Sequence, residues 1–195
     1  MKYALIGAGN LGLALAGHFA GHHIDLALAN SRGAPSLQAA AEALGSAVRA
    51  VDLDEALEAE VIVLAIPFIA HPAIGARKVD WQGQVIVDAM NTYGIDPATL
   101  KGQPSTAVVA RAFPGAKVVK AFNQLPAKVL ARDPGETTGR RVVFIAGDDA
   151  GANVQVEQLV QGLGFAPLVL GDIASASPLI GMGGPLILKN LVRQD

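Results

Sequence analysis

A glycine-rich segment near the start of the chain, Gly7-Ala8-Gly9-Asn10-Leu11-Gly12, constrains the fold more strongly than any other feature of the sequence. It follows a short apolar run and leads directly into a segment whose apolar residues recur at helical spacing. Glycines at this spacing between a strand and a helix are the fingerprint of a dinucleotide-binding βαβ unit. Gly7 permits the tight turn, Gly9 leaves room for a pyrophosphate, and Gly12 lets the helix pack closely on the strand. The free N–H groups at the start of the helix then bind the anion.

Two other nucleotide-binding folds fit these residues less well. A P-loop requires a lysine and then a serine or threonine after its last glycine, whereas Gly12 is followed by Leu13 and Ala14. A methyltransferase usually has glycines at alternating positions, and position 11 is a leucine. The remaining alternative is that an ordinary turn shows this spacing by chance, because the chain has 22 glycines. The strand before the segment and the helix after it favour the dinucleotide site.

Short β-branched and leucine-rich runs alternate with longer segments of helical spacing along the whole chain. This alternation is typical of a largely parallel sheet covered by helices on both faces. The run from Val61 to Ile66 has no polar residue, as expected for a central strand buried on both sides. We therefore predict one α/β domain over residues 1–195, with a Rossmann-type, doubly wound, mostly parallel sheet. Strands are expected at about 2–6, 24–29, 47–50, 61–65, 84–87, 117–121, 141–146 and 167–170, and helices from Asn10, over 36–44 and over 150–162.

Composition narrows the class of protein. A chain of 195 residues with 51% hydrophobic residues can form a continuous core. Because the chain has no cysteine, redox activity would require an organic cofactor such as a nicotinamide. The net charge is −2 and the cationic residues are scattered, which argues against nucleic acid as a partner. No apolar run is long enough to span a bilayer, and the start lacks the features of a signal peptide, so we expect a cytoplasmic protein that does not enter the membrane.

The end of the second predicted strand carries a further signal for the cofactor. The sequence there is Asn30-Ser31-Arg32-Gly33, at the distance where an NAD enzyme normally has an acidic residue for the ribose 2′-hydroxyl. The hydroxyl of Ser31 and the planar guanidinium of Arg32 can instead donate hydrogen bonds to a 2′-phosphate. We therefore predict that NADP is the preferred cofactor. The alternative is that Arg32 is a solvated residue in a surface turn.

Several segments resemble the family of NADP-dependent coenzyme F420 oxidoreductases. They are the glycine-rich segment, Asn30-Ser31-Arg32, Ala65-Ile66-Pro67 followed by His71, Val118 to Pro126, and Ala146-Gly147-Asp148-Asp149. The resemblance implies a Rossmann fold, NADP as cofactor, and coenzyme F420 or a flavin as co-substrate. It also implies that Ala65-Ile66-Pro67 passes beneath the nicotinamide ribose, and that Asn91 and Asn123 border the acceptor pocket. Small bacterial dinucleotide-binding proteins and the cytosolic domains of six-transmembrane metalloreductases are similar.

Two side chains are candidates for a direct part in the reaction. His71 could hold a carboxamide or donate a proton to the acceptor, because a histidine titrates near neutral pH. The alternative is a partly exposed histidine at the start of a helix. Asn123 is predicted to be a pocket residue, whereas nearby Lys120 is predicted to be structural.

Neither the histidines nor the aspartates predict a metal site. His22 and His23 are adjacent in a turn, so their side chains point in different directions, and no cluster of acidic residues or cysteines accompanies them. Asp148 and Asp149 follow a strand and precede a helix, so we interpret them as helix caps rather than as paired catalytic carboxylates.

The leading hypothesis is an NADP(H)-dependent oxidoreductase that transfers hydride between the nicotinamide and a flat, small-molecule acceptor such as coenzyme F420 or a flavin. The alternatives are a reductase of small carbonyl or imine compounds, and a non-catalytic module that senses NADP. We expect the turn-rich stretch 91–104 to lie over the site, and the segment 174–195 to close the pocket or to contact a second copy in a homodimer. The predicted catalytic residues are His71 and Asn123, and the predicted cofactor-binding residues are Gly7, Gly9, Asn10, Leu11, Gly12, Asn30, Ser31, Arg32, Ala65, Ile66, Pro67 and Asn91.

Overall fold

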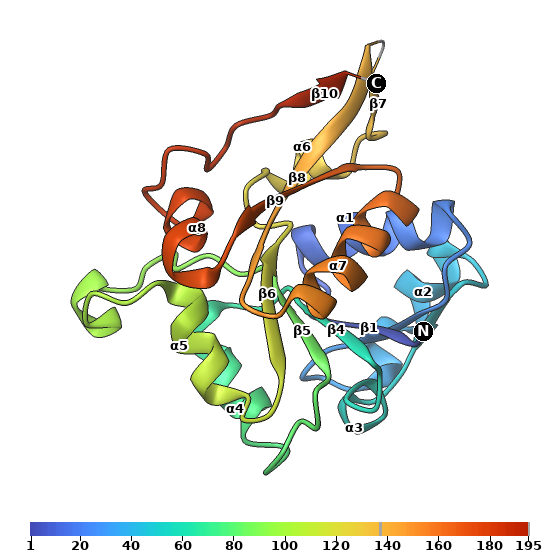
Figure 1. Cartoon of the computed structure of the whole chain (residues 1–195). Coiled ribbons are helices and arrows are strands. Elements are labelled where there is room, and N and C mark those ends of the chain that lie inside the picture. The colour runs from blue at the N-terminus through green and yellow to red at the C-terminus, as the bar shows by residue number, and fades with distance from the viewer. Residues whose placement is uncertain (137, 195) are drawn as a thin grey trace.

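The computed structural model describes residues 1–136 and 138–194, which form a ten-stranded sheet with helices on both sides (Figure 1). Six strands lie parallel in the order β3-β2-β1-β4-β5-β6, which is the order of a dinucleotide-binding fold. β8 pairs antiparallel with β6, and β9 pairs parallel with β8. The predicted Rossmann-type α/β fold is therefore confirmed. The strands are β1 (Tyr3–Ile6), β2 (Leu26–Ala29), β3 (Val48–Ala50), β4 (Val61–Leu64), β5 (Val85–Asp88), β6 (Lys117–Ala121), β7 (Gly135–Glu136), β8 (Gly139–Gly147), β9 (Ala166–Gly171) and β10 (Val192–Gln194).

All eight strands predicted from the sequence are present. The sequence does not predict β7 and β10, which both pair antiparallel with the first residues of β8. These two strands have only two and three residues, and neither shows the apolar alternation that identifies a strand in a sequence.

Each face of the sheet packs against its own set of helices. On β4, Val61 and Val63 belong to the core that contains α1, α2, α6 and α7, whereas Ile62 and Leu64 belong to the core that contains α3 and α5. This burial on both sides explains why the β4 segment has no polar residue. Among the described residues, no helix is both long and apolar enough to cross a membrane. The helices are α1 (Asn10–Gly21), α2 (Gln38–Leu44), α3 (Leu53–Ala56), α4 (His71–Gly75), α5 (Ser105–Ala112), α6 (Ala127–Leu130), α7 (Ala150–Gly162) and α8 (Ile173–Ile180), with short 3₁₀ turns at Ala34–Leu37, Phe68–Ala70 and Pro97–Leu100.

The sequence analysis does not predict α8, and Pro178 within this helix is unfavourable. A local cap and long-range contacts compensate. The side chain of Asp172 caps the helix by accepting from Ser175 N at 2.7 Å, and Asp148 accepts from Ile173 N at 2.8 Å. The buried face of α8, which includes Ile180, packs on β8. Long-range packing therefore stabilises a helix for which the local sequence preference is weak.

Burial of His18 on α1 makes the stability of the fold depend on pH. The side chain is 7% exposed, its Nε2 donates to Leu130 O at 2.6 Å, and its ring packs on Phe165 with 4.8 Å between ring centroids. Burial lowers the pKa of His18, and the hydrogen bond to Leu130 opposes this only in part. The unfolded chain therefore binds a proton at this histidine near pH 6.5, whereas the folded protein binds it only at a lower pH.

We expect the thermal unfolding midpoint to fall as the pH decreases below about 6.5. In His18→Gln this fall should be shallower, because glutamine can donate to Leu130 O and does not titrate. Circular dichroism melts between pH 7.5 and pH 5 would measure both slopes. The exposed His23 supplies the control, because His23→Gln should retain the wild-type slope. Equal slopes for wild type and His18→Gln would refute the assignment.

Candidate functional site

The glycine-rich segment connects β1 to α1 at the point where the strand order reverses, because β1 lies between β2 and β4. Ligands of open α/β sheets bind at this position, beyond the carboxyl ends of the strands. Gly7 has a φ of +114°, and a Cβ there would overlap the carbonyl oxygen of Ala65 at the end of β4. A Cβ on Gly12 would overlap the carbonyl oxygen of Gly7. Neither position can therefore carry a side chain unless the backbone moves.

Gly9 differs from both of these glycines. It is exposed, it precedes the first residue of α1, and a Cβ there would meet no atom within 4 Å. The space that a side chain would fill lies open in front of the first turn of α1, where backbone N–H groups have no partner within the helix. A pyrophosphate requires such an opening, so these residues fit the phosphates of a dinucleotide. Asn10 is exposed beside the opening and Leu11 is half-buried.

The loop after β2 is held by its first residue. Asn30 is buried, accepts from Arg32 N at 2.8 Å, and donates to Ser36 Oγ at 3.0 Å. These bonds form a compact turn that leaves Ser31 and Arg32 exposed. Within the described part of the chain, the guanidinium of Arg32 makes no hydrogen bond or ion pair, so it is available to an anionic ligand.

An acidic residue that sequence reasoning missed lies beside this loop. Asp52 follows β3, and its Oδ1 accepts from Ala34 N at 2.9 Å. It therefore fixes the backbone immediately after Gly33, whose φ is +83°. The sequence carries only a local signal for Asp52, which precedes the acidic first turn of α3 and so has the position of a helix cap. The contact with the loop joins residues 18 positions apart.

The segment after β4 contains the predicted residues Ala65, Ile66 and Pro67. Ala65 N donates to Ile6 O at 2.9 Å, so this segment runs beside the turn at Gly7. Ala65 and Ile66 are half-buried and Pro67 is exposed. The structure thus brings these three residues to the same edge of the sheet as the phosphate loop.

His71 begins α4 and is only 4% exposed, so the interpretation as a partly exposed histidine is wrong. Its Nδ1 bonds to Phe68 O at 2.6 Å, and the two rings lie with centroids 4.7 Å apart. A carbonyl oxygen only accepts, so Nδ1 carries the hydrogen and the neutral ring has its lone pair on Nε2. The turn at 68–70 draws the imidazole inward, which the spacing from Pro67 alone does not reveal. A catalytic role for His71 stays a prediction.

Asn91 and Asn123 follow the adjacent strands β5 and β6, and the structure brings them together. Asn91 Nδ2 donates to Asn123 O at 2.8 Å, and Asn123 Nδ2 donates to Asn91 Oδ1 at 3.0 Å. Asn123 Nδ2 also donates to Ile180 O at 2.7 Å, which connects the pair to the end of α8. Asn123 is 2% exposed, and its Oδ1 has no partner among the described residues. The preceding residue, Phe122, has a φ of +63°, a conformation uncommon for a residue other than glycine.

Directly beside this pair lies a buried ion pair. Lys120 Nζ lies 3.1 Å from Asp88 Oδ2 and donates to Met90 O at 2.6 Å, and both charged side chains are almost fully buried. Asp88 also accepts from Thr106 Oγ1 at 2.8 Å. The arrangement fixes the backbone just before Asn91, in agreement with the structural role predicted for Lys120.

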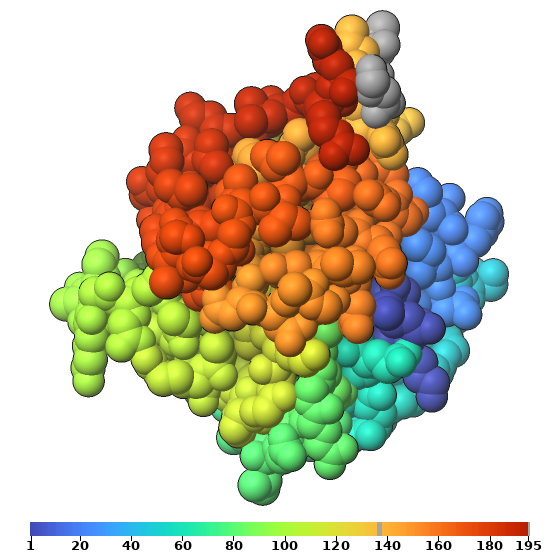
Figure 2. Space-filling model, in the orientation of Figure 1, coloured from blue at the N-terminus to red at the C-terminus, as the bar shows by residue number. Residues whose placement is uncertain are grey.

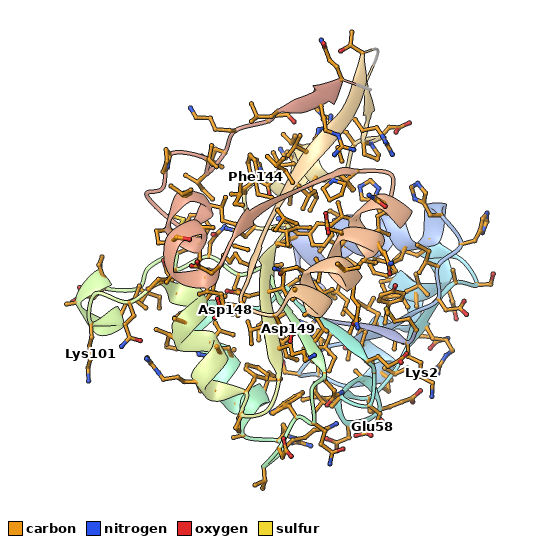
Figure 3. The ribbon with its side chains drawn as sticks, viewed as in Figure 1. Lys2, Glu58, Lys101, Phe144, Asp148 and Asp149 are labelled. Atoms are coloured by element: carbon orange, nitrogen blue, oxygen red, sulfur yellow. The ribbon has the colours of Figure 1, made fainter. Side chains whose placement is uncertain are left out.

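The two consecutive aspartates after β8 cap helices. Asp149 accepts from Ala152 N at 2.8 Å and pairs with Lys117 at 3.1 Å, and Asp148 caps α8. These contacts lower the pKa of Asp149, with the bond from Ala152 N as the largest cause. Both aspartates are labelled in Figure 3, near the starts of α7 and α8. The interpretation as structural caps is therefore confirmed.

A surface hollow of about 510 Å³ lies at the opposite ends of the strands. It is lined by residues at the starts of β1, β2 and β3, and Lys2 and Glu58, which both line it, are labelled at the lower right of Figure 3. Dinucleotides bind at the carboxyl ends of the strands. This hollow is therefore separate from the candidate site.

Comparisons with known proteins agree with the fold. The family model described as "NADP oxidoreductase coenzyme F420-dependent" matches residues 2–92. A solved structure of a hypothetical protein from Sinorhizobium meliloti is similar, with 45% sequence identity, a TM-score of 0.94, and coverage of 100% of this chain and 96% of that chain. A putative F420-dependent NADP reductase from Arthrobacter sp. FB24 has a TM-score of 0.73 at 23% identity, with coverage of 99% of this chain and 100% of that chain.

A curated relative is considerably longer than this chain. Metalloreductase STEAP3 of Rattus norvegicus is 28% identical over 177 residues, which are 90% of this chain. They are only 35% of the metalloreductase, so this chain corresponds to about a third of that protein.

Proposed function

Because this chain belongs to the family of coenzyme F420-dependent NADP oxidoreductases, we propose that it transfers hydride between NADP(H) and a flat acceptor such as coenzyme F420 or a flavin. The observation that carries the proposal is the combination of an open phosphate loop at Gly9 with an exposed guanidinium at Arg32 that has no partner among residues 1–136 and 138–194. The first fits a pyrophosphate, and the second fits the 2′-phosphate that distinguishes NADP from NAD.

The chain offers a place for each part of the cofactor. The backbone from Gly7 to Gly12 would hold the pyrophosphate, and Ser31 with Arg32 would hold the 2′-phosphate. Ala65, Ile66 and Pro67 would contact the ribose of the nicotinamide. Bound NADP(H) supplies the hydride carrier, for which no side chain of the protein can substitute.

The protein's own contribution would be to orient the acceptor and to exclude water. The linked carboxamides of Asn91 and Asn123 form a rigid border at the ends of β5 and β6. Because Asn123 donates a hydrogen bond to Ile180 O at the end of α8, the C-terminal segment would help to close this side of the site. Because Nε2 of His71 carries the lone pair of the neutral ring, it would have to take up a proton before it could donate one to the acceptor at the end of β4.

Wild-type protein should oxidise NADPH in the presence of oxidised coenzyme F420 or a flavin, with a much slower rate for NADH. In Arg32→Glu, the Kd for NADPH should rise by about 10- to 100-fold, because a charge-assisted hydrogen bond is replaced by repulsion, while the Kd for NADH changes little. Following the absorbance of each acceptor would measure turnover, and fluorescence titration would measure binding.

Arg132, which follows α6, is also exposed, so Arg132→Glu should leave both affinities unchanged. An unaltered NADPH affinity in Arg32→Glu would contradict the role of Arg32. Tight NADPH binding without turnover of coenzyme F420, flavin, small carbonyl or imine compounds would overturn the proposed oxidoreductase activity and favour a sensor.

A further inference from the structure

The carboxylate of Asp52 has one oxygen in use and one to spare. Its Oδ1 accepts from Ala34 N at 2.9 Å, which restrains the orientation of the carboxyl group. Its Oδ2 makes no hydrogen bond or ion pair with the described residues, and the side chain is exposed. Because a carboxylate oxygen has two lone pairs, Oδ2 is an oriented acceptor on the surface, beside the loop that carries Ser31 and Arg32.

The strand order indicates which part of the cofactor lies near this oxygen. The nicotinamide ribose is proposed to lie after β4, the pyrophosphate after β1 and the 2′-phosphate after β2, and these strands are neighbours in the sheet. β3 is the next strand beyond β2. Adenine is joined to the ribose that carries the 2′-phosphate, so an extended dinucleotide would continue with its adenine toward the end of β3. Asp52 lies at this end, because the preceding Val51 N still donates to Leu28 O of β2 at 3.0 Å.

The chemistry of Oδ2 fits one group of the base. The exocyclic amine of adenine donates hydrogen bonds, whereas the ring nitrogens of the joined base only accept them. An ionised carboxylate also only accepts. It can therefore bond the amine and no other polar group of adenine. In hypoxanthine a carbonyl oxygen replaces this amine, and Oδ2 would repel that oxygen.

This position is separate from the acceptor side of the candidate site. Three strands, β2, β1 and β4, lie between β3 and the end of β5, where Asn91 follows. Figure 2 shows the first part of the chain, coloured blue to cyan, at the right of the molecule and the red C-terminal segment at the upper left. A substitution at Asp52 therefore tests the adenosine end of the cofactor without altering the acceptor border.

We propose that Asp52 determines specificity for the base of the cofactor, with its Oδ2 accepting a hydrogen bond from the exocyclic amine of adenine. This inference rests on the proposed binding of NADP(H). The two oxygens of one carboxylate then have different tasks. Oδ1 holds the backbone of the loop that would bind the 2′-phosphate, and Oδ2 selects the base.

Wild-type protein should bind NADPH about 10-fold more tightly than its hypoxanthine analogue. In Asp52→Asn the amide oxygen can still accept from Ala34 N, which puts the donor Nδ2 in the place of Oδ2. The preference should then be lost or reversed, with the analogue bound at least as tightly as NADPH. Fluorescence titration would measure both Kd values. The two ligands carry the same phosphates, so the loss of a negative charge at position 52 cancels in the ratio of these values.

Asp54 on α3 supplies the matched control. It is exposed and its side chain pairs with Arg77. Asp54→Asn removes the same charge two residues away and should keep the wild-type preference for adenine, and the thermal midpoints of all three proteins should be nearly equal. An unchanged preference in Asp52→Asn, or a wild type that binds both ligands equally, would overturn the assignment. Weaker NADH binding in Asp52→Asn together with an unchanged base preference would assign Oδ2 to the ribose hydroxyl instead.

The same titrations distinguish this inference from the proposed function. Wild-type protein that prefers adenine but transfers no hydride would contradict the oxidoreductase activity and leave the role of Asp52 intact. Protein that turns over NADPH and its analogue with equal affinity would contradict only the role of Asp52. Protein that binds neither ligand would contradict both.

Discussion

Gly9→Val is expected to bind NADPH at least about 100-fold more weakly than the wild-type chain while keeping nearly all of its stability. A Cβ at Gly9 would meet no protein atom within 4 Å, so we expect the fold to accommodate a small side chain there. The backbone φ of −81° is also accessible to valine, and losing glycine before the first helical residue costs about 1 kcal/mol at most. The added methyl groups would instead fill the opening proposed for the pyrophosphate. Fluorescence titration with NADPH and circular dichroism melts would measure the two effects separately.

Two further glycine variants make this result specific. Gly21 is exposed at the other end of α1 and also has open space around it, so Gly21→Val should retain NADPH affinity. Gly12→Ala should show the opposite pattern to Gly9→Val. Its Cβ would overlap Gly7 O, and the required backbone shift should cost at least about 2–3 kcal/mol of unfolding free energy. If Gly9→Val bound NADPH as tightly as wild type, the phosphates could not lie at the start of α1.

The sequence predicts this part of the molecule well because its requirements are local. The turn after β1 needs a positive φ at Gly7 and a close approach at Gly12, and both demands are visible as glycines within six residues. The apolar run at β4 is equally direct, since burial on both faces excludes every polar side chain. Such features depend on neighbours in the chain rather than on distant ones.

Contacts between distant segments were not predictable in the same way. Asp52 fixes the loop after β2 from 18 residues away, and Asp148 caps α8 from 25 residues away. The local composition around Pro178 argues against α8, which forms because its buried face packs on β8. The inward turn of His71 onto Phe68 likewise depends on a 3₁₀ turn that the sequence pattern does not show.

The contact between Lys120 and Asp88 joins residues 32 positions apart, and it supports the largest change in stability that we expect from a single substitution. Lys120→Met should lower the free energy of unfolding by about 3–5 kcal/mol, because it leaves the carboxylate of Asp88 buried without a cation. Met90 O would lose its 2.6 Å hydrogen bond at the same time. In a domain of this size, the thermal midpoint should fall by roughly 10 °C. Circular dichroism melts and urea titrations would measure both quantities.

A second substitution, at Asp88, separates two contributions to the lower unfolding free energy of Lys120→Met: the uncompensated buried charge and the lost packing. Asparagine has nearly the same shape as aspartate, and its oxygen can still accept from Met90 N, as Asp88 Oδ1 does at 3.0 Å. The double variant Lys120→Met/Asp88→Asn buries no net charge, so it should be more stable than Lys120→Met alone even though it carries one more substitution. If the uncompensated charge is not the cause, the double variant will be no more stable than the single one. Because Met90 directly precedes Asn91 and the double variant still lacks the ion pair, NADPH turnover should stay low despite the recovered thermal midpoint if the ion pair holds the Asn91–Asn123 border of the site in place, and should recover with the midpoint if it does not.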